Sequence, residues 1–192
     1  MIELFDIADV NQSAAAFNPE KLLWLNQQHI IAMPGEQLGS ALQPYLEKLG
    51  LDIIAGPSPA DVAEGFRERA GTLSEMAESC RYCYEDYAEI DPKSVKKHLR
   101  PIILSPMREL LEVLGGLQSW EAGAIGKAIE TIAARHDINL GKLGQPLRVA
   151  VTGGPVSPPI DVTVALVGRD RSLSRLRHAI GIIEQRAAQQ TP

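Results

Sequence analysis

The chain has 192 residues, of which 45% are hydrophobic and 22% are charged. This length and composition suit a globular protein that buries a sizeable core without disulfides, as one large domain or two small ones. No apolar run approaches the roughly 18–20 residues needed to cross a bilayer, and no signal pattern follows Met1. A membrane-spanning protein is therefore excluded, and we expect a cytoplasmic location with no membrane partner.

The net charge of −5 argues against a nucleic-acid binder, but its distribution is uneven. Residues 142–192 contain seven Lys/Arg and three Asp/Glu, which leaves this stretch at +4 and the rest of the chain at −9. Such asymmetry can mark a local contact surface for phosphate on an acidic protein. The alternative is a solvated helix face that binds nothing.

Apolar residues recur at three- and four-residue steps through nearly the whole chain, which predicts helices throughout. The first predicted helix has Asn18 as its N-cap and Pro19 at its first position. The second covers Gly35–Gly50, and we expect Pro44 to kink or split it. Further starts are indicated at Ser58–Pro59, at Thr72 with Glu75 in capping-box spacing, and at Asp91–Pro92.

In the second half, cap signals at Ser105–Pro106 and Ser119 predict two more helices, the later one running from Ala122 to His136. The run from Pro146 to Val151 would also suit a strand; we favour a short helix, because proline suits a first turn. Ser157–Pro158 would cap a helix that ends at Gly168. The final predicted helix starts at Asp170, with Leu173, Leu176, Ile180 and Ile183 inward and Arg171, Arg175 and Arg186 outward.

Signatures of a self-contained enzyme are missing from the sequence. There is no phosphate-binding Gly-rich loop of Walker type, no His-Glu-x-x-His and no Gly-x-Ser-x-Gly. The four histidines are scattered without metal spacing, and Cys80 with Cys83 lacks the second ligand pair of a structural zinc site. We therefore predict no catalytic and no metal site, and interpret the chain as a binding module.

Three segments together resemble the C-terminal half of bacterial glutamyl-tRNA synthetase, a class I aminoacyl-tRNA synthetase. The first holds Asp9–Ser13, Ala16–Asn18 and Lys21–Asn26. The second holds Thr72–Leu73, Glu75–Met76, Ser79–Tyr82 and Tyr84–Asp86. The third holds Pro146–Gly153, Ser157–Pro158, Asp161–Thr163 and Ile180.

The resemblance implies an all-α, helical-bundle anticodon-binding domain in two subdomains. Residues 1–45 would end the stem-contact region, 46–100 would form the first anticodon-binding subdomain and 101–192 the second. The Leu99–Pro101 break is the best candidate for a boundary. The family's nucleotide-binding catalytic domain, with its His-Ile-Gly-His-type and Lys-Met-Ser-Lys-type signatures, is absent from this chain.

The parent enzyme would ligate glutamate to tRNA, using ATP and Mg that this chain itself does not bind. The chain, as a monomer, would bind the anticodon loop of glutamate tRNA. The resemblance places Arg148 and Thr152 at the anticodon and makes Ser157, Pro158, Pro159 and Ile160 the base-reading turn. It also places Arg67, Arg69 and Gly71 in a region that meets an anticodon base in some relatives.

Three points stay open at this stage. Gly71 or a neighbour stands where some relatives have an arginine that excludes the glutamine anticodon, so the parent enzyme can be a non-discriminating one. Arg169, Arg171 and Arg175 are candidates for backbone contacts or are simply solvated. The whole chain can instead be a structural or protein-interaction module without tRNA selectivity.

Overall fold

The computed structural model describes residues 18–189, and within this range every regular element is a helix. The prediction of an all-α fold is therefore confirmed. The predicted stem-contact region lies partly outside the described residues. The helices are α1 (Pro19–Ala32), α2 (Gly35–Lys48), α3 (Pro59–Phe66), α4 (Leu73–Ser79), α5 (Arg81–Tyr84), α6 (Pro92–His98), η3 (Pro101–Ile103), α7 (Leu104–Gly115), α8 (Ala122–Arg135), α9 (Leu140–Thr152), α10 (Ile160–Val167) and α11 (Arg169–Ala188).

Side-chain caps fix the starts of several helices, as the sequence predicts. The side-chain oxygens of Asn18, Ser58 and Thr72 accept hydrogen bonds from backbone N–H groups three residues later. Asp91 does the same at the start of α6. Each cap satisfies a backbone donor that has no partner inside its helix, and so determines where the helix begins.

Other predicted boundaries are wrong. Ser105 does not cap α7, because the helix already begins at Leu104, directly after η3. Pro146 is not in a first turn: it lies in the middle of α9, whose cap is Asn139. Ser157 does not cap α10, which follows Pro159 without a side-chain cap. Pro44 does not split α2, which runs through it as one helix.

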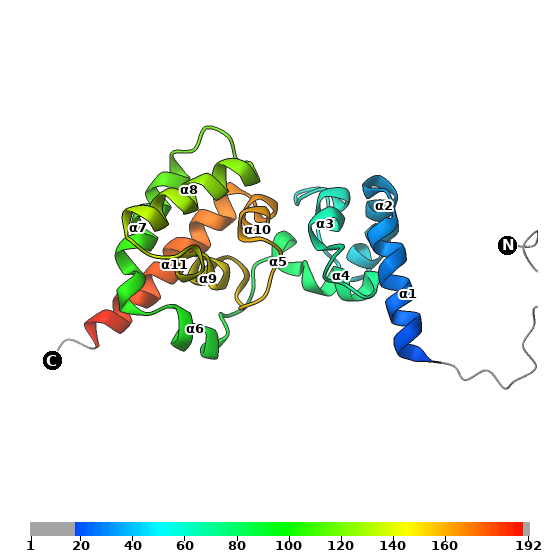
Figure 1. Cartoon of the computed structure of the whole chain (residues 1–192), viewed down its shortest axis with the longest axis horizontal. Coiled ribbons are helices and arrows are strands. Elements are labelled where there is room, and N and C mark those ends of the chain that lie inside the picture. Colours follow the sequence, from blue (N-terminus) through cyan, green and yellow to red (C-terminus); the bar gives the residue numbers. More distant parts are fainter. Residues whose placement is uncertain (1–17, 190–192) are drawn as a thin grey trace, which may run out of the picture.

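The helices form two groups joined by α5 (Figure 1). In the N-terminal lobe, residues 19–79, α2 packs against α3 and α4. In the C-terminal lobe, residues 92–188, α9 packs against α6, α8, α10 and α11. The lobes meet where α10 contacts both α3 and α5. The subdomain boundaries expected at 45/46 and 100/101 stay predictions, although α6 lies before the second of them and packs on α9.

Apolar stripes build the core of each lobe. Leu38, Leu42 and Leu46 recur at four-residue steps on α2 and are fully buried. In the C-terminal lobe, α9 is the most enclosed helix, with Leu143, Leu147 and the run Val149–Val151 at 0% exposure. This burial makes α9 a rigid base for any site built on its ends. By contrast, α1 exposes large apolar side chains, namely Leu22, Leu23, Trp24 and Leu25.

Candidate nucleic-acid interface

The two ends of α9 are defined by local sequence. At its start, Oδ1 of Asn139 accepts from the backbone N–H of Lys142 at 2.8 Å. At its end, Gly153 adopts φ = +77°, a left-handed conformation that favours glycine. A Cβ at Gly153 would also lie 3.0 Å from the ring of Tyr87, so the chain can turn only with glycine here.

The turn after α9 is held by hydroxyl groups. The Thr152 hydroxyl lies 2.9 Å from the Arg148 carbonyl and accepts from the backbone N–H of Gly154 at 3.2 Å. The Ser157 hydroxyl accepts from Nε of Arg148 at 2.8 Å and from the Thr163 hydroxyl at 3.0 Å. Arg148 and the turn are thus built as one unit, in which the Ser157 side chain is directed inward.

A cavity of about 520 Å³ lies where this turn faces the N-terminal lobe. Helices α4 and α5 form one wall of this cavity, and the turn after α9 forms the opposite wall. We call the cavity the interlobe groove. It is lined by Phe66, Arg69, Glu75, Ser79, Tyr82, Thr152, Gly154, Pro155, Val156, Ser157 and Pro158.

Positive charge gathers beside the groove without an acidic partner. The pKa of Arg148 is lowered, chiefly by burial and next by the positive charge of Arg69. Neither arginine forms an ion pair with any residue of the described range, and Nη2 of Arg148 has no hydrogen bond there. The carboxylate of Glu75, which also lines the groove, accepts from the backbone N–H of Gly71. The groove can therefore receive an anion.

The predicted site residues divide into two groups. Arg69, Thr152, Ser157 and Pro158 line the interlobe groove, and Arg148 contacts it through Ser157. The remaining predicted residues do not line it. Arg67 donates hydrogen bonds to Glu64 and to the Ile31 carbonyl, and the backbone of Gly71 forms hydrogen bonds with Glu75 and Asn26. Pro159 is exposed directly before α10, and Ile160 packs against the core.

The aromatic wall of the groove has no counterpart among the predicted site residues. Tyr82 lines the groove, with its ring centroid 6.1 Å from that of Phe66. Burial raises the pKa of Tyr82, so its hydroxyl stays protonated. Aromatic rings are the usual platforms for stacked bases. The available signal was Tyr82 itself, an aromatic residue within a segment that resembles the family.

The C-terminal arginines have a structural role, contrary to the prediction that Arg175 points outward. Arg175 is 6% exposed and donates to the carbonyls of Tyr82, Glu85 and Val151. Arg171 donates to the carbonyls of Cys83 and Tyr84. Because these hydrogen bonds occupy the guanidinium groups, Arg171 and Arg175 hold α5 against α11 and are not exposed contacts for RNA.

Other kinds of site find little support in the described range, residues 18–189. It contains no group of three or more His, Cys, Asp and Glu side chains placed to hold a metal ion. None of its helices is both long and apolar enough to cross a membrane. Cys80 and Cys83 are buried free thiols, and burial raises the pKa of Cys80 to about 12. These thiols are therefore unreactive in the folded protein.

Comparison with known protein families matches residues 37–180 to the anticodon binding domain. The chain belongs to this anticodon-binding family. The match covers most of both lobes and includes the whole interlobe groove. The groove is therefore a feature of an anticodon-binding domain, not of an unrelated helical bundle.

Solved structures show the same fold. The chain aligns with a glutamate tRNA ligase from Elizabethkingia meningosepticum at a TM-score of 0.84 and 24% identity, over 92% of this chain and 35% of that one. It aligns with the glutamate-tRNA synthetase of Elizabethkingia anophelis at a TM-score of 0.79 and 24% identity, over 92% of this chain and 34% of that one. The anticodon-binding chain thus spans about a third of the length of these proteins.

Proposed function

We propose that this chain binds the anticodon loop of glutamate tRNA as the C-terminal part of a glutamate–tRNA ligase. The interlobe groove is the observation that carries the proposal, since a family match alone would not locate a binding site. The groove combines a cavity, an aromatic wall and two arginines without acidic partners. The names of the solved structures with the same fold support glutamate tRNA as the partner.

The groove suits single-stranded RNA because such RNA is bound by splaying bases out of the loop and stacking them on flat side chains. Tyr82, backed by Phe66, offers the stacking surface. Arg69 is exposed at the rim and can contact a phosphate or a base edge. Arg148, fixed by Ser157 and Gln145, presents its remaining N–H donors in a set orientation. Less side-chain entropy is then lost on binding.

The catalytic chemistry would belong to a part of the protein outside this chain. The parent enzyme would use ATP and Mg there, and would transfer glutamate to the far end of the tRNA. The contribution of this chain would be recognition, in which the correct anticodon loop binds more tightly than a wrong one.

The test compares binding of three RNA stem-loops that share one stem and differ only in the loop: the glutamate anticodon, the glutamine anticodon and a scrambled sequence. We expect the glutamate loop to bind at least about tenfold more tightly than the scrambled loop, a typical margin for a pair of charge-assisted hydrogen bonds. The ratio between the glutamate and glutamine loops measures discrimination. Equal binding of all three loops would refute the proposal and favour a structural or protein-interaction module.

The variant Arg148→Ala links this preference to the groove. We expect it to reduce affinity for the glutamate loop about tenfold or more and to leave binding of the scrambled loop nearly unchanged. Arg177→Ala is the matched control, because Arg177 is exposed on α11 and lines none of the cavities described. Circular dichroism of both variants verifies folding. Full preference retained in Arg148→Ala would remove Arg148 from the site.

A further inference from the structure

A second cavity lies on the C-terminal lobe, between α6, η3 and the first half of α9. Its volume is about 460 Å³. We call it the basic cavity, because its lining includes three cations and no carboxylate. The lining residues are Lys97, His98, Arg100, Ile102, Ile103, Ile138, Asn139, Gly141, Lys142, Gln145 and Pro146. In a protein of net charge −5, such a concentration of one sign is unexpected.

The three cations of the basic cavity are available to a ligand. Lys97, Arg100 and Lys142 are exposed, and their side chains form no hydrogen bond or ion pair with any described residue. The arginines of α11 differ in this respect, since Arg171, Arg175 and Arg186 all donate to carbonyl groups. Arg177 of α11 and Lys127 of α8 are also exposed, but neither lines the basic cavity or the interlobe groove, whereas the three cations of the basic cavity line one cavity together.

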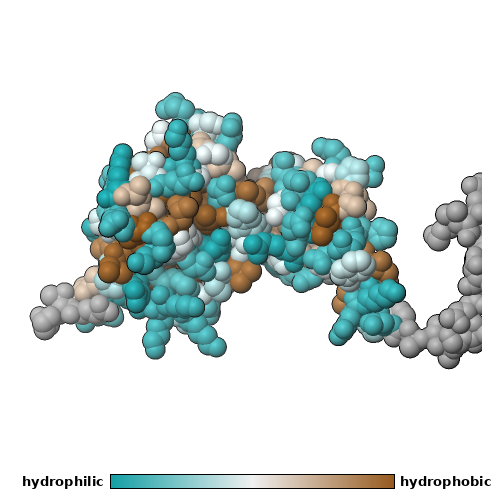
Figure 2. All heavy atoms as spheres, viewed as in Figure 1, coloured by the Kyte–Doolittle hydropathy of each residue, from teal (hydrophilic) through white to brown (hydrophobic). Residues whose placement is uncertain are grey.

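The positive charge of the cavity also acts on a histidine in its lining. The pKa of His98, which lines the cavity, is lowered first by burial and next by the positive charge of Lys97. Figure 2 shows hydrophilic residues over the bottom of the C-terminal lobe, where Figure 1 places α6. An anion bound here would relieve the repulsion among these groups.

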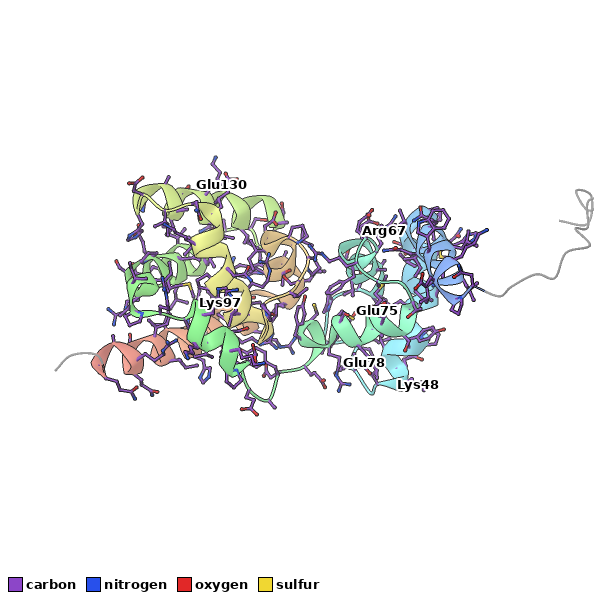
Figure 3. The ribbon with its side chains drawn as sticks, turned by 60° about the horizontal axis from the view of Figure 1, so that its bottom comes forward. Lys48, Arg67, Glu75, Glu78, Lys97 and Glu130 are labelled. Atoms are coloured by element: carbon purple, nitrogen blue, oxygen red, sulfur yellow. The ribbon has the colours of Figure 1, made fainter. Side chains whose placement is uncertain are left out.

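One face of α9 connects the basic cavity with the interlobe groove. Lys142, Gln145 and Arg148 follow each other at three-residue steps, so they share a helix face and span about 9 Å along its axis. Gln145 lines the basic cavity, accepts from Arg148 and donates to the Pro155 carbonyl, which belongs to the groove. In Figure 3, Lys97 of the cavity and Glu75 of the groove are both in view with the bottom of the molecule turned forward.

We propose that the basic cavity binds the sugar–phosphate backbone of the same RNA whose loop bases enter the interlobe groove. The strand would run along α9, with its bases at Arg148 and Tyr82 and its flanking phosphates at Lys97, Arg100 and Lys142. The combination of a stacking platform with a neighbouring cationic path is typical of proteins that bind single-stranded nucleic acid. The inference rests on the proposed function only for the identity of the RNA.

The test uses a variant with Lys97→Ala, Arg100→Ala and Lys142→Ala together. Its control removes the same charge elsewhere, by Lys21→Ala, Lys127→Ala and Arg177→Ala, three exposed cations that line none of the cavities described. Binding of the glutamate and scrambled stem-loops is measured from about 50 to 200 mM salt. Circular dichroism checks the fold of each variant.

We expect the cavity variant to weaken both stem-loops by the same factor, about tenfold or more at low salt. The slope of log affinity against log salt should fall by about 2–3, since each lost phosphate contact reduces it by about 0.7–0.9. The control variant should retain the slope of the original chain. Equal slopes in the two variants, or a loss confined to the glutamate loop, would overturn the proposal.

Two further arms separate this inference from its alternatives. If the original chain does not prefer the glutamate loop but the cavity variant still loses salt dependence, the proposed function fails and the backbone site stands. Vesicles containing phosphatidylserine test a membrane surface instead. The inference would be refuted if the cavity variant lost binding to these vesicles but bound RNA as tightly as the original chain.

Discussion

Arg175 is a charged side chain placed in the interior of the protein. It donates hydrogen bonds to the carbonyls of Tyr82 in α5 and Val151 in α9, and its guanidinium lies 4.8 Å from the Tyr87 ring centroid. Asp86, its ion-pair partner, is largely exposed. The bonds to buried carbonyls, more than this ion pair, therefore account for its place in the fold.

We expect Arg175→Met to reduce the free energy of unfolding by roughly 3 kcal/mol or more, because several buried carbonyls lose their donor. Methionine retains much of the apolar volume, so the effect is not merely one of packing. Urea unfolding followed by circular dichroism measures it. Arg177→Met, on the exposed side of the same helix, should change the value by less than about 0.5 kcal/mol. Equal effects of the two variants would contradict this role.

The burial of Arg175 does not follow from the helical pattern of leucines around it. Leu173, Leu176 and Ile180 predict an inward face that does not include it. Arg175 nevertheless stands three and four residues from Ser172 and Ala179, both of which are buried. Two of its carbonyl partners, those of Tyr82 and Glu85, are 93 and 90 residues away in the chain, and the third, that of Val151, is 24 residues away. No local periodicity encodes such a contact, which is why its direction could not be predicted.

At the scale of elements, four of the predicted helix starts are fixed by a side-chain cap, whereas the cap of α9 at Asn139 was not predicted. Asn18, Ser58, Thr72 and Asp91 each bond the backbone within three residues, so the signal is wholly local. The middle position of Pro146 in α9 depends instead on tertiary packing, because Pro146 and its neighbour Leu147 are buried, and this packing offsets the lost hydrogen bond.

Asp91 offers a direct test of a cap. Its carboxylate accepts from the backbone and hydroxyl of Ser94, and these bonds lower its pKa. The stabilisation is therefore present above the unfolded pKa of about 3.8 and is lost as the pH falls through the folded value. We expect Asp91→Ala to reduce the free energy of unfolding at pH 7 and to reduce it by less near pH 3. Urea unfolding at both pH values measures the difference.

Asp91→Asn serves as the control for this prediction. Asparagine can keep the cap at pH 7, but it has no carboxylate to protonate. The variant should therefore be close to the original chain in stability and should lose the part of the pH dependence that Asp91 supplies. A pH dependence identical to that of the original chain would contradict the assignment.

At the scale of the whole molecule, the interlobe groove depends on how the two lobes pack against each other. Its lining comes from α3, α4 and α5 on one side and from the turn after α9 on the other. Three of the lining residues on the side of the turn, Thr152, Ser157 and Pro158, are among the site residues that the family resemblance implies. The aromatic wall was not predicted, because the approach of Tyr82 to the turn depends on how the lobes pack and on no sequence spacing.

The packing between the two lobes should also lose stability at alkaline pH. Burial raises the pKa values of the thiols and phenols in this region: Cys80, Cys83, Tyr82 and Tyr84. The folded state holds these protons more tightly than the unfolded state, so their contribution to stability is complete below the unfolded thiol pKa of about 9 and falls as the pH rises toward 12. We expect the urea midpoint to fall steadily between pH 8 and pH 10.5.

The variant Cys80→Ala with Cys83→Ala separates the thiols from the other groups that titrate in alkali. Its urea midpoint should decline less steeply over the same pH range, whatever its stability at pH 8. Ellman's reagent should label the original chain only once urea has unfolded it, since both thiols are buried. Rapid labelling of the folded chain would show that the packing around the two thiols opens far more often than a packed structure allows.

The hydrogen bonds between α11 and α5 have a consequence for folding during translation. The donors Arg171 and Arg175 follow the carbonyls they bond in α5 and the residue after it by 87–93 residues. A chain emerging from the ribosome therefore exposes α3, α4 and α5 well before the groups that fix them have been translated. Synthesis halted after Gly168 would release a chain that contains every predicted site residue of the groove but cannot hold the Tyr82 wall against the turn.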